Sequence, residues 1–156
     1  MHDQRFLELS ASYLGEYARK IGKSLEGISE EQLWWRPNGA SNSAGNLLLH
    51  LSGNLSQWVL AALGGVVYNR DRDAEFAATE GASKQELYAR LQDVVASCAM
   101  VIRGLPAAEL QARRTIRGDD VDGVEAVYHA VEHMSYHTGQ IAFIAKQLAG
   151  KGLPLD

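Results

Sequence analysis

The sequence predicts an all-α protein, a four-helix bundle in up-down-down-up order with a long crossover between the second and third helices. Apolar residues recur at spacings of three and four residues in four long segments, and glycine or proline follows each segment. Strand patterns are weak, since the short segment Thr115-Ile116-Arg117 has no obvious partner. Four amphipathic helices bury their apolar faces by packing together.

The first helix is predicted from about Asp3 to Leu25, and Gly27 ends it. Its expected buried stripe follows helical spacing: Phe6, Tyr13, Leu14, Tyr17, Ile21 and Leu25. Ser29-Glu30-Glu31-Gln32 then matches a capping box. This box can start only a short turn, because Pro37 and Gly39 follow soon after it.

The second helix is predicted to begin after Ser41 or Ser43, because either serine can cap it, and to continue to about Leu63. Gly64-Gly65 ends it. A helix of about 20 residues is about 30 Å long. At roughly 3.3 Å per residue, the connection 64–82 is long enough to return along such a helix. The third helix is therefore expected to run parallel to the second.

The third helix is predicted to begin at the capping box Ser83-Lys84-Gln85-Glu86 and to end near Gly104. Its expected buried face comprises Leu87, Leu91, Val94, Val95, Cys98, Val101 and Ile102. The fourth helix is predicted to open at Asp122 and to continue to about Leu148, with Gly150 just beyond it.

The composition indicates one globular domain, residues 1–156, with a hydrophobic fraction of 46%. A net charge of -4 is unlike the basic footprint of a nucleic-acid-binding protein. Cys98 is the only cysteine, which excludes an internal disulfide and a thiolate-rich metal site. No apolar run reaches the roughly 18 residues that span a bilayer, and the N-terminus lacks signal-peptide features. We expect a cytoplasmic protein without a nucleic-acid or membrane partner.

Three histidines point to a specific chemistry. His133 and His137 are four residues apart, so their Cβ atoms are about 5–6 Å apart on one helix face. His50 stands in Leu47-Leu48-Leu49-His50-Leu51, the most apolar part of the second helix, and should point inward. Three converging imidazoles would bind one divalent metal and leave a coordination position open, as catalytic zinc sites do. Singly, such a histidine is more often a hydrogen-bonded core residue than a ligand.

Neighbouring polar residues have more than one interpretation. His129 lies in the same row and is either a partner that supports the ligands or a core histidine. Asn54 and Gln140 either orient ligands through hydrogen bonds or cap a loop and face water. The Glu-x-x-His pairs of di-iron bundles are absent. Three neutral imidazoles suit several metals, and geometry alone does not choose among them. We expect zinc or nickel, with iron, manganese and copper as alternatives.

Two helical motifs resemble the DinB-like superfamily of metal-binding helical proteins. The first is Asn42-Ser43-Ala44-Gly45-Asn46-Leu47-Leu48-Leu49-His50-Leu51, followed by Gly53-Asn54. The second is Tyr128-His129-Ala130-Val131-Glu132-His133-Met134-Ser135-Tyr136-His137-Thr138-Gly139-Gln140-Ile141. Arg70-Asp71-Arg72-Asp73-Ala74-Glu75-Phe76 is similar to one uncharacterised branch of that superfamily. The resemblance covers nearly the whole chain.

The resemblance implies an up-down-down-up bundle, often dimeric, with one divalent metal held by His50, His133 and His137. Members with known activity use a small cellular thiol, as thiol S-transferases and a mycothiol-dependent maleylpyruvate isomerase do. Many members have arginine where this chain has Thr138. If that arginine binds anionic groups, the substrate class differs here.

The sequence therefore predicts a metal-dependent enzyme that acts on a small molecule, by thiol-dependent transfer or isomerisation or by hydrolysis. Two alternatives remain at this point: a non-catalytic metal-binding stress or sensor protein, and a metal-free helical dimerisation module. No residue stands out as a general base. The charged segment 70–75 either rims a pocket or forms a solvated surface.

Overall fold

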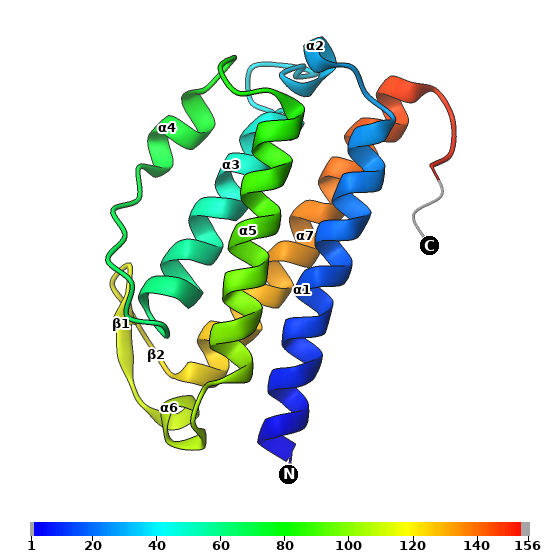
Figure 1. The fold of residues 1–156 in the computed structure, drawn as a ribbon. Helices are drawn as coiled ribbons and strands as arrows, with labels where there is room; N and C mark the ends of the chain where they lie inside the picture. Colours follow the sequence, from blue (N-terminus) through cyan, green and yellow to red (C-terminus); the bar gives the residue numbers. More distant parts are fainter. Residues whose placement is uncertain (1, 154–156) are drawn as a thin grey trace.

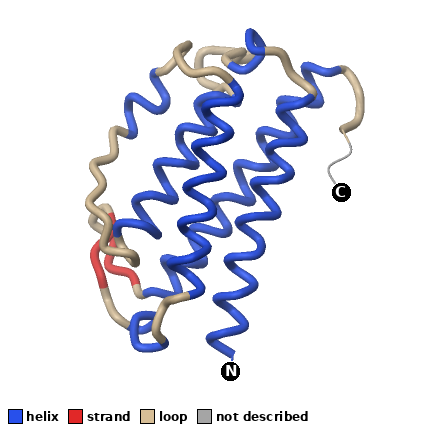
Figure 2. Tube along the Cα trace, viewed as in Figure 1, coloured by secondary structure: helices blue, strands red, loops and turns tan. Residues whose placement is uncertain are grey.

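The computed structural model describes residues 2–153, which are mostly helical, so the predicted all-α class is confirmed. Four long helices lie side by side: α1 (His2–Glu26), α3 (Ala44–Leu55), α5 (Lys84–Arg103) and α7 (Gly123–Ala149) (Figure 1). In Figure 1, α1 and α7 run in one direction, and α3 and α5 run in the other. Figure 2 shows that loops and a short hairpin connect them at the two ends. Among the described residues, no helix is both long and apolar enough to cross a bilayer.

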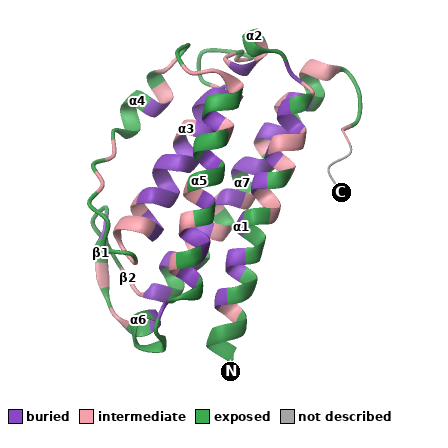
Figure 3. Cartoon of the chain, in the orientation of Figure 1, coloured by how far each residue is buried: buried purple, intermediate pink, exposed green. Residues whose placement is uncertain are grey.

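The core lies between the four long helices, whose buried faces turn toward one another (Figure 3). Its largest fully buried side chains include Leu14, Ile21, Leu48, Leu51, Leu91, Ile102, Met134 and Ile141. The predicted stripe of α1 was wrong at Tyr13, which is 44% exposed and stacks on Tyr17 at 5.9 Å between ring centroids. Leu7, Ala11 and Ala18 are buried on that helix. A tyrosine keeps its hydroxyl in water at little cost, so aromatic spacing is a weak guide to burial.

Helix ends follow the predicted capping signals closely. Complete capping boxes form at Ser29, Ser43, Ser83 and Asp122. Ser43, rather than Ser41, caps α3, and the box at Ser29 starts only the short α2 (Glu30–Leu33). Gly150 ends α7 at φ 63°, a left-handed conformation that glycine adopts without a steric penalty.

After Leu55 the second long helix changes from α to π geometry over Ser56–Ala61, labelled η1. The sequence analysis predicted an uninterrupted helix here, because side-chain spacing does not distinguish the two forms over six residues. Single π turns inside helices are frequent at functional sites. Trp58 on this turn is buried and stacks on His129 of α7, with ring centroids 3.9 Å apart.

A two-stranded hairpin joins α6 (Ala107–Gln111) to α7, and β1 (Arg114–Ile116) pairs antiparallel with β2 (Asp119–Val121). The sequence analysis expected no partner strand for Thr115-Ile116-Arg117, and this expectation was wrong. The turn residues Arg117 and Gly118 have φ values of 57° and 93°, as tight hairpin turns require. The partner strand Asp119-Asp120-Val121 has no strand-like pattern of its own. Hairpin residues of the second, smaller core cluster pack against η1 and the start of α7.

The long crossover between α3 and α5 runs along the outside of α3 and contains α4 (Arg72–Ala77), which packs on α3 (Figure 1). The Asn46 amide anchors it, because Nδ2 donates to the carbonyl oxygens of Glu75 at 2.9 Å and Ala78 at 2.7 Å. Arg36 Nη2 donates to the carbonyl oxygens of Phe76 and Ala78. The crossover is therefore fixed against the helix that carries His50.

The buried Cys98 gives a direct test of the core. Its Sγ lies 3.7 Å from the Leu55 carbonyl oxygen, and burial raises the pKa of the thiol to about 12. Because the thiolate is the reactive form, we expect the native thiol to react with an aromatic disulfide reagent at pH 8 about a thousandfold more slowly than the thiol of the unfolded chain. Reaction kinetics with and without guanidinium chloride measure this ratio. Fast stoichiometric labelling of the native protein would contradict the packing of α3 against α5.

Candidate metal centre

The structure brings the three predicted histidines together. His50 lies on α3, and His133 and His137 lie one turn apart on the facing helix α7. The Nε2 atoms of His50 and His133 are 2.9 Å apart, and ligand atoms of all three rings lie within 4.8 Å of one another. His50 and His137 are only 4% and 7% exposed. Three histidines from two helices therefore form one largely buried cluster.

The donor set fits a divalent transition metal. Zinc binds imidazole nitrogen at about 2.0–2.1 Å, so two nitrogens of a tetrahedral site are about 3.3 Å apart. In the structure, the Nε2 atoms of His50 and His133 are 2.9 Å apart, and all the ligand atoms lie within 4.8 Å of one another. The required separation of about 3.3 Å falls between these two values. The three-histidine group can thus hold a metal ion after small shifts of the rings.

The protonation state of the cluster also suits a metal. Burial, together with the neighbouring His137 and His50, lowers the pKa of His133 to about 3. Burial likewise lowers the pKa of His137 to about 4, although the hydrogen bond that the ring donates to Gln140 acts in the opposite direction. Neutral imidazole is the form that binds metals. At neutral pH these two rings therefore need no deprotonation before they can act as ligands.

Glu75 and Arg70 lie behind His50, on the side away from the other two histidines. Glu75 Oε2 is 3.1 Å from His50 Nδ1, and Arg70 binds the same carboxylate through Nε and Nη2, each at 2.8 Å. The two side chains are only 10% and 3% exposed. The alternative of a solvated surface for the charged segment 70–75 was thus wrong for these two residues. Charge spacing alone does not reveal that the crossover turns them inward.

The ion pair selects the tautomer of His50. Arg70 Nη2 also lies 3.0 Å from His50 Nδ1, but its two hydrogens point to Glu75 Oε2 and to the His50 carbonyl oxygen. His50 Nδ1–H therefore donates to Glu75, which leaves the Nε2 lone pair facing the cluster. Burial raises the pKa of Glu75, yet hydrogen bonds from Arg70 and His50 outweigh this, and the net pKa lies below its usual value. The carboxylate stays charged.

Gln140 acts on His137 in a similar way. Its Oε1 lies 2.6 Å from His137 Nδ1, so the ring donates through Nδ1–H and presents Nε2 to the cluster. Such support of a ligating histidine fixes the orientation of the ring and increases its basicity. Of the two hydrogen-bonding roles predicted for Gln140, the structure therefore favours orientation of a candidate ligand.

Asn54 and His129 form a separate pair beside the cluster. Asn54 Nδ2 is 3.2 Å from His129 Nε2, so the hydrogen-bond partner of this amide is His129, which lies beside the three clustered histidines. The His129 ring stacks on Trp58, its centroid lies 5.1 Å from that of His133, and burial lowers its pKa. His129 is not among the three residues whose ligand atoms converge. It packs as a partly buried neighbour of His133.

Thr138 has no direct part in the cluster. It is buried, and its hydroxyl donates to the Met134 carbonyl oxygen at 2.7 Å. A threonine that bonds its own helix in this way presents no charge to a ligand.

Comparisons with known proteins identify the family. The DUF1572 family, whose members are of unknown function, matches residues 2–153. The chain belongs to the DUF1572 family. No protein with a curated description matches it. The expectation that the chain belongs to an uncharacterised family is thereby confirmed.

Two solved structures show the same fold as this DUF1572 protein. A conserved protein from Enterococcus faecalis is 16% identical, with a TM-score of 0.76 over 92% of this chain and 96% of that one. A DinB-like protein from Bacillus subtilis, YjoA, is 18% identical, with a TM-score of 0.70 over 94% of this chain and 95% of that one. At these identities the likeness concerns the fold, and the activity must be argued from the site.

Gly53 tests the packing behind His50. A Cβ at this position would overlap Glu75 Oε1 and would lie 3.0 Å from Arg70 Nε, whereas a Cβ at Gly15 of α1 would meet open space. We expect Gly53→Ala to displace the buried ion pair and to lower the free energy of unfolding by about 1–3 kcal/mol.

Gly15→Ala is the matched control and should raise stability by about 0.5–1 kcal/mol, because alanine loses less backbone entropy in a helix. Urea denaturation of both variants provides the comparison. Equal stabilisation by the two substitutions would show that Glu75 and Arg70 do not pack against Gly53.

Proposed function

We propose that this protein is a metal-dependent enzyme in which His50, His133 and His137 hold one divalent metal with an open coordination position. The proposal rests on one arrangement of side chains. Ligand atoms of three histidine rings converge, and two of these rings, His50 and His137, also have a hydrogen-bond partner on the nitrogen that faces away from the group. Such partners are typical of ligating histidines, because they fix the orientation of the ring whose other nitrogen binds the metal.

An open position follows from the composition of the group. Within residues 2–153, the convergent set contains three histidines and no cysteine or carboxylate. The nearest buried carboxylate, Glu75, contacts Nδ1 of His50 and so lies on the opposite side of that ring. Closed four-ligand sites are structural, whereas three protein ligands leave a place for water or substrate. This argument favours catalysis over a purely structural or sensing role.

A bound metal would supply a Lewis acid that lowers the pKa of a thiol or water at the open position. The chain's own residues prepare the site for it. Glu75 keeps the proton of His50 on Nδ1, and Gln140 does the same for His137. Burial keeps His133 neutral. The resemblance favours a small cellular thiol as cosubstrate, hence thiol-dependent transfer or isomerisation, with hydrolysis as the second reaction class.

The proposal extends to topology and assembly. The four long helices would form the up-down-down-up bundle of DinB-like proteins, and the helix directions in Figure 1 support this order. A homodimer remains a prediction. Two exposed aromatic side chains outside the cavity described below offer contacts for it, Tyr13 on α1 and Tyr128 on α7.

Metal content tests the ligand assignment. Protein purified without a histidine tag should contain about one divalent transition metal per chain, and either His50→Ala or His137→Ala should lower metal affinity by at least about a hundredfold. His129→Ala is the matched control, since it removes a neighbouring imidazole outside the group, and should keep its metal. Elemental analysis and chelator competition give the values. Unchanged metal content in all three variants would refute the assignment.

Cobalt substitution tests the thiol. A thiol that binds the metal is deprotonated. We therefore expect cysteine, glutathione or mycothiol to produce a strong near-ultraviolet charge-transfer band when titrated into the cobalt form. His50→Ala protein treated identically should show no band. If none of these thiols changes the spectrum while phosphate or carboxylate esters are cleaved, the enzyme is a hydrolase.

A further inference from the structure

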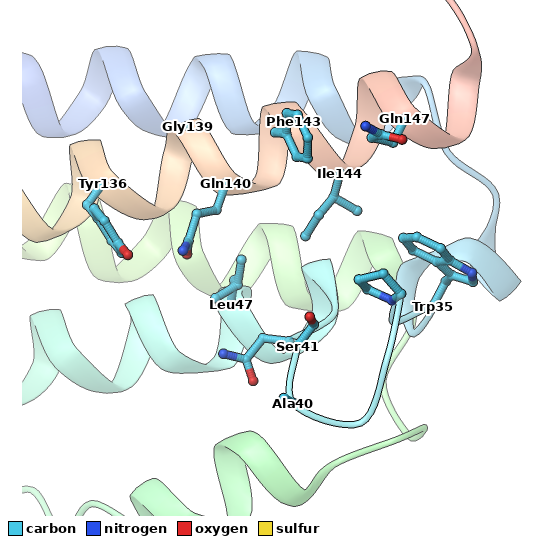
Figure 4. Close-up of a pocket in the computed structure, with 12 residues that line it drawn as sticks. Trp35, Ala40, Ser41, Leu47, Tyr136, Gly139, Gln140, Phe143, Ile144 and Gln147 are labelled. Atoms are coloured by element: carbon cyan, nitrogen blue, oxygen red, sulfur yellow. The ribbon is translucent and has the colours of Figure 1, made fainter.

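A cavity of about 690 Å³ lies between the loop 35–42, the start of α3 and the second half of α7. Figure 4 shows Trp35, Phe143 and Ile144 around it, with Leu47 on the α3 side. Its polar lining consists of hydroxyls and carboxamides: Ser41, Asn42, Tyr136, Gln140 and Gln147. None of the lining residues carries a charge. Its size falls within the range of about 300–1,000 Å³ typical of small-molecule sites.

The cavity borders the histidine cluster on the His137 side. Gly139 and Gln140, which line it, follow His137 within one helical turn, and Leu47 precedes His50 by three residues. The ring of Tyr136, also in the lining, meets the His137 ring edge-on with centroids 5.0 Å apart. A molecule in the cavity would therefore contact side chains that touch the candidate metal ligands.

Gln140 gives the cavity a positioned hydrogen-bond donor. Because its Oε1 accepts the His137 Nδ1–H, the amide orientation is set, and Nε2 has no hydrogen-bond partner among the described residues. Figure 4 shows this side chain extending from α7 into the space opposite Leu47. A ligand with a carbonyl oxygen near Gln140 would satisfy the free N–H groups, whereas a purely hydrocarbon ligand would leave them unsatisfied.

We propose that this cavity, next to the histidine cluster, binds an uncharged, flat aromatic molecule with a hydrogen-bond acceptor such as a carbonyl group. Rings from Trp35, Tyr136 and Phe143 favour stacking with an aromatic ligand. A carboxylate would lose hydration without meeting a cation in the lining, which disfavours anionic ligands.

Three naphthalene probes of one shape test the chemistry: 2-acetylnaphthalene, 2-naphthoate and 2-ethylnaphthalene. Calorimetric titration uses the full chain, both as purified and after treatment with a chelator. We expect 2-acetylnaphthalene to bind at least about tenfold more tightly than 2-naphthoate and several-fold more tightly than 2-ethylnaphthalene in both forms. Equal or tighter binding of 2-naphthoate overturns the proposed ligand class.

Gly139→Leu tests the location. A Cβ at Gly139 meets open space, so a leucine there would extend into the cavity without backbone strain. Gly15→Leu is the matched control, because Gly15 is also helical, exposed and unobstructed, and lies outside the lining. We expect Gly139→Leu to weaken 2-acetylnaphthalene binding at least about tenfold and Gly15→Leu to leave it unchanged. Both variants should keep the metal content of the parent protein.

Two outcomes separate this inference from the proposed function. If Gly139→Leu binds the ketone like the parent, the cavity assignment is overturned while the metal assignment stands. If the parent protein binds the ketone as expected but binds no metal, the proposed function fails and the cavity remains a ligand site.

Discussion

The buried contact between His50 and the Glu75–Arg70 pair is the constraint on which the organisation of the site depends. Two charged side chains at this depth are tolerable only when each is paired, since an unpaired buried charge is costly. Gly53 makes room for the carboxylate, and Asn46 holds the backbone of the crossover against α3. The crossover thereby becomes part of the histidine cluster, although it contributes none of the three clustered rings.

A hydrogen-bond partner also orients the histidine at the opposite side of the cluster. His137 is oriented by Gln140, whose remaining amide hydrogens face a cavity without charged groups. One carboxamide thus connects the candidate metal site to the candidate binding site. Near His133, the π turn in the second long helix lets Trp58 cover His129, and the hairpin packs over that contact. The clustered rings are therefore oriented by partners from the crossover and from α7 itself, while the π turn and the hairpin pack around the neighbouring His129.

Local signals predicted the features that depend on residues close in sequence. The capping boxes at Ser29, Ser83 and Asp122 formed as expected, because each satisfies backbone donors within three residues. The convergence of His133 and His137 follows from helix geometry. Tyr13 and the strand partner of β1 were predicted wrongly, since burial and strand pairing depend on what lies opposite.

The sequence by itself determined the helical class, the helix ends and the inward position of His50, because periodicity and capping act over a few residues. Tertiary structure alone decided that Glu75 and Arg70 stand behind His50, that Gln140 supports His137 while Asn54 meets His129, and that an uncharged cavity adjoins the cluster. These contacts join elements that are distant in the chain. Their side-chain directions depend on how the crossover and the helices pack, and no local pattern encodes that packing.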